Sequence, residues 1–357
     1  MGLFFCLMPE TTMKAAILEA VGKLRLADVP RPACPPGGLV IEVRACAVCT
    51  TDVKMVQRGQ RDLRYPRVLG HEVAGVVAEC DAGVEGLEPG QRVHVAPGVA
   101  CGRCAACRRG ADNRCERIEI IGFSRDGGFA QWMAAPAESV QIGGVTRLPD
   151  ALPFELAALA EPLACCINAQ DRLHLTSADR LLVLGGGPVG CLHVMLARAR
   201  GVGEVLLVER SPARARLAEA AGATRIIVSE PDQMEAQVRW ATGDEGVDAA
   251  VAACADADVD SLVRALRPGG RLCLFSGLHP QRATAQLDAN RVHYEELGIT
   301  GAYGCTARQN RQATELIASK AVDASWLVTM RVPLDRIQDA IDYTAERSGM
   351  KAVVTGF

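Results

Sequence analysis

The sequence predicts an α/β protein in two parts, a mostly β part over about the first 150 residues and then a parallel sheet with helices. In the first part, short apolar runs such as 39–43, 73–78 and 92–95 lie between turn residues, which is typical of short strands. From Leu181 onward, apolar runs alternate with Ala-rich helical stretches, which is typical of a parallel sheet buried on both faces. The length of 357 residues fits two domains of ordinary size.

The expected elements follow this division. In the first part we expect strands at 14–18, 39–43, 73–78 and 92–95, and then a helix over 154–170. In the second part we expect strands at 181–184, 204–208, 226–228, 247–253 and 271–276, with helices at 191–200 and 212–221. After about residue 305, the pattern predicts a helix at 311–318 and a final strand at 351–354.

Charge and composition exclude several classes of function. Lys and Arg number 39 against 42 Asp and Glu, so the basic excess of a nucleic-acid-binding protein is absent. Aromatic residues make up only 4%, which disfavours a base-stacking surface. The apolar run at 3–8 lacks a basic flank and is too short for a secretory signal or a membrane span. We therefore expect residues 1–12 to be a disordered extension, with Met13 as a candidate natural start, and no membrane partner.

The chain has 15 cysteines, an odd number in a long sequence. Disulfide scaffolds are short and cysteine-dense, so this count favours metal-bound and free thiols in a reducing compartment. We therefore expect a cytoplasmic protein.

Four of these cysteines, Cys101, Cys104, Cys107 and Cys115, follow the spacing C-x2-C-x2-C-x7-C. Four thiolates on one short lobe suit a tetrahedral structural zinc ion, which needs no open coordination position. Four free surface thiols and an iron–sulfur cluster are the alternatives, although the spacing lacks the ferredoxin pattern.

A Gly-rich turn follows the strand expected at 181–184 and opens a helix. Such a turn lets a dinucleotide pyrophosphate approach the helix N-terminus. The contacting residues we expect are Gly185, Gly187, Pro188, Val189 and Gly190. Glu209 ends the next strand about twenty residues on, where an acid binds the ribose hydroxyls and repels a 2′-phosphate, so NAD is favoured over NADP. The adjacent Arg210 weakens that preference, and an ordinary βα turn is the alternative interpretation.

A second set of metal ligands is scattered along the chain. Cys49 lies in Cys49-Thr50-Thr51-Asp52, His71 in Gly70-His71-Glu72, and Glu161 much later. One thiolate, one imidazole and one carboxylate form a zinc set with an open fourth position, as a catalytic site requires. Taken singly, Cys49 could be a buried apolar residue and Glu161 a helix-terminal charge.

Together, these motifs resemble the zinc-containing medium-chain dehydrogenases, in particular the sorbitol/L-iditol dehydrogenase branch. The resemblance also includes Gly127-Gly128-Phe129-Ala130 and the stretch from His293 to Gly304, and it covers the chain from about Lys14 to its end. It implies a GroES-like catalytic domain at 13–168 and 306–357, with a zinc-binding lobe at about 97–117. A Rossmann NAD-binding domain at 169–305 would interrupt it.

The resemblance also implies roles for the site residues. Cys49 and His71 match ligands of the catalytic zinc, and both Glu72 and Glu161 match positions for the third, carboxylate ligand. Thr51 matches the hydroxyl residue that relays the proton. Lys54 stands where the family often has a histidine that ends this relay, so the lysine either completes it or is a solvated charge. The pocket lining would include Met55, Arg58, Phe123 and Tyr303.

The function implied is that of an NAD(P)-dependent oxidoreductase acting on CH–OH donors (EC 1.1.1.-), with two zinc ions per chain. Its substrate would be a small-molecule alcohol, namely a polyol, cyclitol or other secondary alcohol that is oxidised to a ketone. The alternatives are a threonine-type or simple secondary-alcohol dehydrogenase of the same superfamily, and a non-catalytic, zinc-stabilised NAD-binding structural or sensor protein. Members of the family are commonly dimers or tetramers, so a homo-oligomer is expected.

Overall fold

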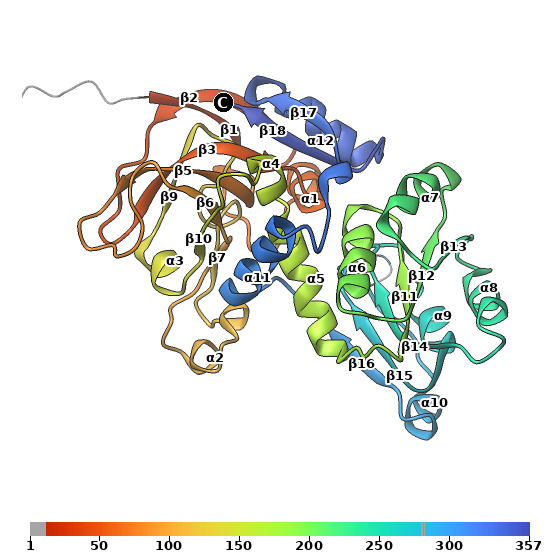
Figure 1. Cartoon of the computed structure of the whole chain (residues 1–357). Helices are drawn as coiled ribbons and strands as arrows, with labels where there is room; N and C mark the ends of the chain where they lie inside the picture. The colour runs from red at the N-terminus through yellow and green to blue at the C-terminus, as the bar shows by residue number, and fades with distance from the viewer. Residues whose placement is uncertain (1–11, 280, 282) are drawn as a thin grey trace, which may run out of the picture. The chain divides into compact units, whose positions relative to one another are not determined.

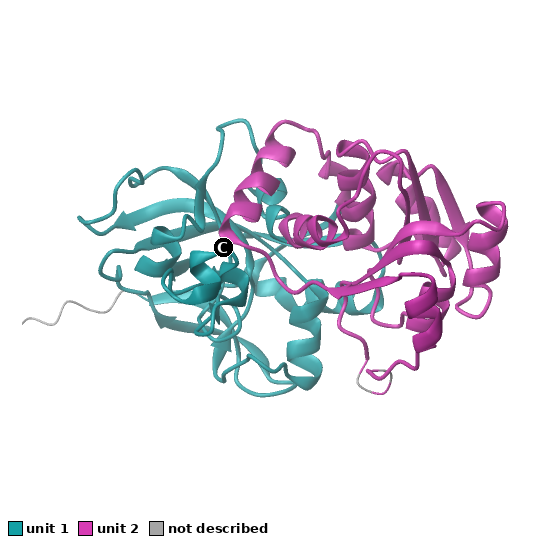
Figure 2. Cartoon of the chain, turned by 90° about the horizontal axis from the view of Figure 1, so that it is seen from below, with its two compact units in different colours: residues 1–161, 328–357 teal, residues 162–327 magenta. Residues whose placement is uncertain are grey.

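The structure is a computed structural model that describes residues 12–279, 281 and 283–357 (Figure 1). It divides into two compact units, coloured separately in Figure 2. Unit 1 holds the described residues up to Glu161 together with Val328–Phe357, and unit 2 holds Pro162–Leu327. These limits differ from the domain limits inferred from the sequence in that 162–168 and 306–327 group with unit 2. The expected extension at 1–12 lies outside the described residues except for Thr12, which begins the first strand.

Unit 1 is mostly β, as the sequence predicts, and is built on a mixed sheet. Its strand order is β10-β6-β5-β3-β18-β17, with β9 also pairing with β3. These strands are β3 (Leu39–Ala47), β5 (Glu72–Cys80), β6 (Arg92–Val95), β9 (Trp132–Ala135), β10 (Val145–Arg147), β17 (Val328–Pro333) and β18 (Lys351–Gly356). Ala47 on β3 pairs with Glu72 on one side and with Val353 on the other. This register brings the last strand of the chain beside the start of β5.

Two smaller sheets complete the β structure of unit 1. One has the order β2-β1-β4, formed by β1 (Thr12–Leu18), β2 (Leu24–Pro30) and β4 (Arg67–Val68). The other pairs β7 (Gly98–Val99) with β8 (Glu119–Ile120), and these two strands flank the four-cysteine segment.

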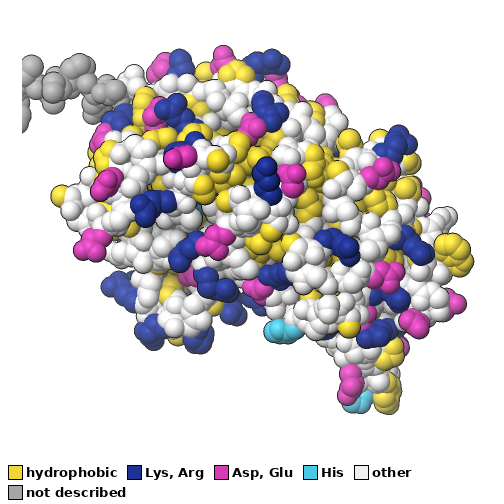
Figure 3. All heavy atoms as spheres, in the orientation of Figure 1, with side chains coloured by type: hydrophobic (Ala, Val, Ile, Leu, Met, Phe, Trp, Pro, Cys, Tyr) yellow, Lys and Arg dark blue, Asp and Glu magenta, His cyan; other side chains and the backbone are white. Residues whose placement is uncertain are grey.

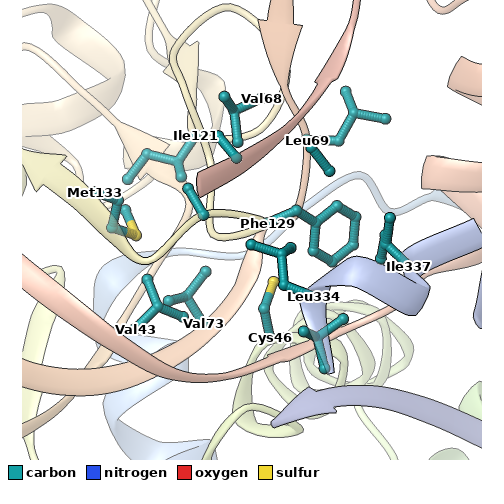
Figure 4. Close-up of a cluster of buried hydrophobic side chains, with 14 of the residues drawn as sticks. Val43, Cys46, Val68, Leu69, Val73, Ile121, Phe129, Met133, Leu334 and Ile337 are labelled. Carbon is teal, nitrogen blue, oxygen red and sulfur yellow. The ribbon is translucent and has the colours of Figure 1, made fainter. Parts of the chain in front are cut away.

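The core of unit 1 surrounds Phe129, which is fully buried among aliphatic side chains from several strands (Figure 4). Cys46 lies in this core with no exposed surface. Gly70 has φ +91°, and a Cβ atom there would come within 2.7 Å of Cys46 Sγ and 2.8 Å of Phe129 Cδ1. Only glycine fits this position. Cys46 and Phe129 therefore fix the backbone that leads into His71.

The helices of unit 1 were predicted less well than its strands. Helices α1 (Thr50–Arg58), α3 (Ala137–Gln141) and α12 (Ile337–Glu346) were missed. Strands β2, β9, β10 and β17 and the two-residue strands β4, β7 and β8 were missed as well. The single helix expected over 154–170 is instead two, α4 (Phe154–Ala157) and α5 (Ala160–Leu173). Pro162 has no N–H to donate to Ala158, so the helical hydrogen bonds cannot run through this point. The short helix α2 (Ala105–Arg108) lies in the four-cysteine segment.

Unit 2 is built on a six-stranded parallel sheet with the order β13-β12-β11-β14-β15-β16. The strands are β11 (Arg180–Leu184), β12 (Glu204–Glu209), β13 (Arg225–Val228), β14 (Val247–Ala252), β15 (Leu266–Leu274) and β16 (Gly298–Gly301). The helices are α6 (Pro188–Ala199), α7 (Pro212–Ala218), α8 (Met234–Ala241), α9 (Val259–Arg264), α10 (Ala289–Tyr294) and α11 (Ala307–Ala318), with most of α5.

This order is that of a doubly wound dinucleotide-binding sheet. The predicted parallel sheet is confirmed. The direction of winding reverses between β11 and β14, which is where such sheets bind ligands. The Gly-rich turn follows β11 at this point. None of the helices in the described ranges is long and apolar enough to cross a membrane.

Candidate active site

Cys49, His71 and Glu72 meet in unit 1, with their ligand atoms all within 4.8 Å of one another. Cys49 is the N-cap residue of α1, with extended φ and ψ of −95° and 151°. His71 precedes β5, and Glu72 begins it. His71 and Glu72 are buried and Cys49 is half-buried, so one thiol, one imidazole and one carboxylate converge in a largely water-free place.

Asp52 orients two of these groups from within the first turn of α1. Its Oδ2 accepts a hydrogen bond of 2.8 Å from the backbone N–H of Cys49, and its Oδ1 lies 3.3 Å from His71 Nδ1. A carboxylate on one ring nitrogen leaves the other nitrogen directed toward a metal. The sequence pointed to Asp52 only through its spacing from Cys49. The structure shows it as the residue that positions His71.

The surroundings of His71 act on its protonation in opposite directions. Burial lowers the pKa of the imidazole, but the Asp52 carboxylate and the Cys49 thiol raise it by more, so the pKa stands well above its usual value. The ring of Phe123 meets the imidazole edge-on, with ring centroids 5.1 Å apart. Phe123 therefore forms one wall beside His71, where the sequence placed pocket lining.

Lys351 was not anticipated from the sequence. Its Nζ donates a hydrogen bond of 2.6 Å to Glu72 Oε1, and both side chains are buried. Burial lowers the pKa of the ammonium, while Glu72, Cys49 and Glu161 together raise it above its usual value. The ammonium group therefore remains charged beside the carboxylate.

The donor set fits a zinc ion. Thiolate, imidazole and carboxylate are the ligand types of catalytic zinc sites with an open position. Glu72 Oε2 is buried and has no hydrogen-bond partner within the described parts of the chain, so one carboxylate oxygen remains available to a metal.

Glu161, the other candidate carboxylate, lies in the first turn of α5 and is buried. Among the described residues, it is not part of the group formed by Cys49, His71 and Glu72. Its charge nevertheless reaches Lys351, whose pKa it helps to raise. Both carboxylates thus act on one lysine.

The other expected site residues are spread over different environments. Thr51 and Lys54 are half-buried on the first two turns of α1, and Arg58 is exposed at its end. Met55, which was expected to line a pocket, has its side chain fully buried in the core of unit 1. Tyr303 lies in unit 2 and is 54% exposed.

The four cysteines of the lobe converge as predicted, with their sulfur atoms within 4.8 Å of one another. Backbone N–H groups of Arg103 and Cys104 lower the pKa of the Cys101 thiol to about 6. At Cys107, burial and the neighbouring thiols raise the pKa to about 12. Four clustered sulfurs, one of them already prone to ionise, fit a structural zinc ion.

Arginines crowd the outside of this lobe. Arg103, Arg108, Arg109 and Arg114 are exposed, and basic side chains gather over the region of α2 in Figure 3. Four thiolates around one zinc ion carry a net negative charge, which these side chains offset in part.

The Gly-rich turn after β11 has the close approaches that its sequence implies. Gly185 has φ +110°, and a Cβ atom on Gly190 would lie 1.7 Å from the carbonyl oxygen of Gly185. Gly187 is the N-cap residue of α6, and Pro188 and Val189 form its first turn. The backbone therefore presents the open helix N-terminus that a pyrophosphate occupies.

Glu209 lies against this turn. Its Oε2 accepts a hydrogen bond of 2.7 Å from Gly186 N, and its Oε1 accepts one of 2.8 Å from Ser211 N. The Arg214 guanidinium lies close to Gly187 of the turn, since a Cβ atom added to Gly187 would be 3.1 Å from it. Arg210, by contrast, has an exposed side chain. Arg214 is a positive group at the turn that the sequence did not reveal, because helix α7 brings it back from five residues beyond Glu209.

Comparison with known proteins matches both parts of the chain. Residues 35–145 match the family described as "Alcohol dehydrogenase GroES-like domain", and residues 188–319 match "Zinc-binding dehydrogenase". Sorbitol dehydrogenase of Bacillus subtilis is 32% identical over 92% of this chain and 93% of its own length. L-threonine 3-dehydrogenase of Pyrococcus horikoshii is 34% identical over 79% of this chain and 78% of its own.

A solved structure shows the same fold. The putative zinc-binding dehydrogenase of Sinorhizobium meliloti, bound to NADP, superposes with a TM-score of 0.88. It is 30% identical, and the match covers 97% of this chain and 99% of that one.

Proposed function

The chain belongs to the zinc-dependent medium-chain dehydrogenases, in the sorbitol dehydrogenase-like branch, and on that premise we propose that it oxidises a polyol, cyclitol or related secondary alcohol to a ketone, with NAD as the acceptor. The family is one of oxidoreductases acting on alcohols, so a non-catalytic sensor is not supported. The observation that carries the proposal is the convergence of Cys49, His71 and a buried carboxylate in unit 1.

We assign Cys49, His71 and one carboxylate, Glu72 or Glu161, as the ligands of the catalytic zinc. When bound, zinc polarises the substrate oxygen and so eases loss of its proton. Asp52 holds the imidazole in one orientation, and Lys351 holds Glu72 at its Oε1 atom. Thr51 receives the substrate proton at its hydroxyl and passes it toward solvent, either directly or through Lys54. Phe123 excludes water from one side of His71.

A carboxylate in place of a further thiolate makes a harder ligand set, which suits hydroxyl-rich substrates. A threonine-type activity is the second candidate, and it rests on the 34% identity to the threonine dehydrogenase of Pyrococcus horikoshii. Recognition of an amino acid would require paired charges in the pocket beyond those of Asp52 with His71 and Glu72 with Lys351.

We propose that NAD is preferred over NADP, because the Glu209 carboxylate lies at the Gly-rich turn and would repel a 2′-phosphate. The positive charge of Arg214 at the same turn would attract a 2′-phosphate and therefore opposes this preference. We also propose that the protein forms a homo-oligomer. We propose a cytoplasmic location for it, because a reducing compartment keeps its many thiols reduced.

The proposal is tested with a panel of polyols, cyclitols, secondary alcohols and threonine, following reduction of NAD and of NADP by absorbance. We expect Cys49→Ser and His71→Ala to lose turnover and to lower the zinc content from two ions per chain to one. Binding of NADH, followed by its fluorescence, should persist. Cys46→Ala is the matched control, since Cys46 lies in the core three residues earlier, and it should retain both zinc ions. Normal turnover in both site variants would contradict the proposal.

A further inference from the structure

Two cysteines that belong neither to the group of Cys49, His71 and Glu72 nor to the four-cysteine lobe lie close together within unit 2, in a group with Glu161. Cys165 lies on α5, and Cys305 directly precedes Thr306, the N-cap residue of α11. Their sulfur atoms lie within 4.8 Å of each other although 140 residues separate them along the chain (305 minus 165). A disulfide bond is about 2.0 Å long, so the two sulfur atoms have to move closer together for a bond to form.

The backbone on either side of this pair is held in place. Asn168 Nδ2 on α5 donates a hydrogen bond of 2.8 Å to the carbonyl oxygen of Gly304, next to Cys305. Gln309 Nε2 on α11 donates one of 3.0 Å to Asp171 Oδ2 on α5. These contacts keep α5 and the start of α11 together, so the two thiols remain neighbours.

The two thiols differ in access. Cys165 is half-buried, whereas Cys305 is only 8% exposed. Asn310 Nδ2 donates a hydrogen bond of 3.1 Å to Cys305 Sγ and so fixes the direction of that side chain. An external reagent therefore meets Cys165 first and finds Cys305 behind it.

We propose that Cys165 and Cys305 form a redox-active dithiol, which an external disulfide such as oxidised glutathione converts to an intrachain disulfide between α5 and α11. The Cys165 thiolate attacks one sulfur of the external disulfide, forms a mixed disulfide and releases one thiol. The Cys305 thiolate then attacks the Cys165 sulfur and releases the second thiol. The protein loses two electrons and two protons, and the external disulfide becomes two thiols.

The neighbouring cysteines do not offer this geometry. Cys166 is fully buried, and its thiol faces the carbonyl oxygen of Val189 at 3.7 Å. Cys191 is fully buried, and burial raises the pKa of its thiol to about 12, which leaves almost no thiolate to react. Cys166 and Cys191 should therefore take no part in the reaction.

The test uses the full chain loaded with zinc, so that the metal ligands are protected. The protein is incubated with oxidised glutathione, the remaining thiols are alkylated, and the peptides are identified by mass spectrometry. We expect the peptide with Cys165 to be joined to the peptide with Cys305, lighter by two hydrogens and separated again by dithiothreitol. In Cys305→Ser, the reaction should stop with glutathione attached to Cys165.

A second measurement and a control complete the test. The bridge closes a long loop, so the oxidised protein should unfold at a higher urea concentration than the reduced one, and Cys165→Ser should abolish the difference. Cys166→Ser is the matched control, because it removes the adjacent thiol and should leave the bridge intact. Attachment of glutathione to Cys165 and Cys305 separately, or recovery of both as alkylated thiols, would overturn the proposal.

Discussion

The Nζ atom of Lys351 lies 2.6 Å from Oε1 of Glu72, although 279 residues separate the two along the chain. Both side chains are almost completely buried. Strand β18 brings the lysine to β3, whose residue Ala47 pairs with both Glu72 and Val353. An ion pair made by the last strand of the chain thus holds a carboxylate of the proposed zinc site.

We predict that Lys351→Met destabilises the zinc-free protein by about 3–5 kcal/mol, because it leaves the Glu72 carboxylate buried without a counter-charge. Urea unfolding of the wild type and the variant measures this difference. If Glu72 binds zinc, the ion compensates the missing ammonium group, and the difference should shrink in the zinc-loaded protein. If Lys351→Met lowers the free energy of unfolding equally with and without zinc, Glu161 would be favoured as the carboxylate ligand. Lys14→Met, at a half-exposed ion pair, is the control and should cost less than about 1 kcal/mol.

We predict that Cys104→Ser removes one zinc ion per chain and opens the four-cysteine lobe. The lobe between β7 and β8 has few buried apolar side chains, so metal coordination supplies most of its order. Limited digestion with trypsin should then cut at the exposed Arg103, Arg108, Arg109 and Arg114, whereas the wild type resists. Cys80→Ser, at a half-buried cysteine outside the lobe, should retain both zinc ions. Unchanged metal content in Cys104→Ser would exclude the four-cysteine site.

We predict that Glu209→Ala shifts cofactor preference toward NADP by about tenfold or more in the ratio of kcat/KM values. The substitution removes the carboxylate beside Gly186 and leaves Arg210 and Arg214 to attract a 2′-phosphate. Steady-state kinetics with both cofactors measures the ratio. Glu219→Ala, an exposed acid ten residues further on, should leave the ratio unchanged. An unaltered ratio in Glu209→Ala would mean that this carboxylate does not select the cofactor.

We predict that His193 makes the protein acid-sensitive. The imidazole is completely buried on α6 and packs edge-on against Phe275, and neither ring nitrogen has a hydrogen-bond partner in the described ranges. Burial, assisted by the charge of Arg200, lowers the pKa of His193 to about 3. A histidine with a depressed folded-state pKa stabilises the fold fully above its unfolded pKa of about 6.5, and loses that contribution as the pH falls toward 3.

The free energy of unfolding should therefore fall by about 2–3 kcal/mol between pH 6.5 and pH 4 through this group alone. Urea unfolding over that pH range should show a correspondingly smaller fall in His193→Leu. His293→Gln, which replaces an exposed histidine, should show the same fall in the free energy of unfolding as the wild type. Parallel pH profiles for the wild type and His193→Leu would contradict the prediction.

Much of this molecule could be predicted because its signals are local. Four cysteines within fifteen residues, a Gly-rich turn after an apolar run, and Glu209 at the end of the next strand are all set by short stretches of chain. Five of the six parallel strands of unit 2 were recognisable in outline for the same reason, since buried parallel strands are continuous apolar runs. The sixth, β16, was missed, because it is short and mostly exposed. Helix α1 was missed because it is short and follows β3 almost directly.

By itself, the sequence determined the fold class, the dinucleotide turn, the four-cysteine lobe and the types of ligand at the second metal site. Only the tertiary structure decided that Glu72, rather than Glu161, groups with Cys49 and His71, that Asp52 orients the imidazole, and that Lys351 pairs with Glu72. The physical reason is that spacing along a helix or turn is set by local geometry, whereas contacts between distant residues depend on strand order and register. A one-residue slip of β18 against β3 would turn Lys351 to the opposite face of the sheet.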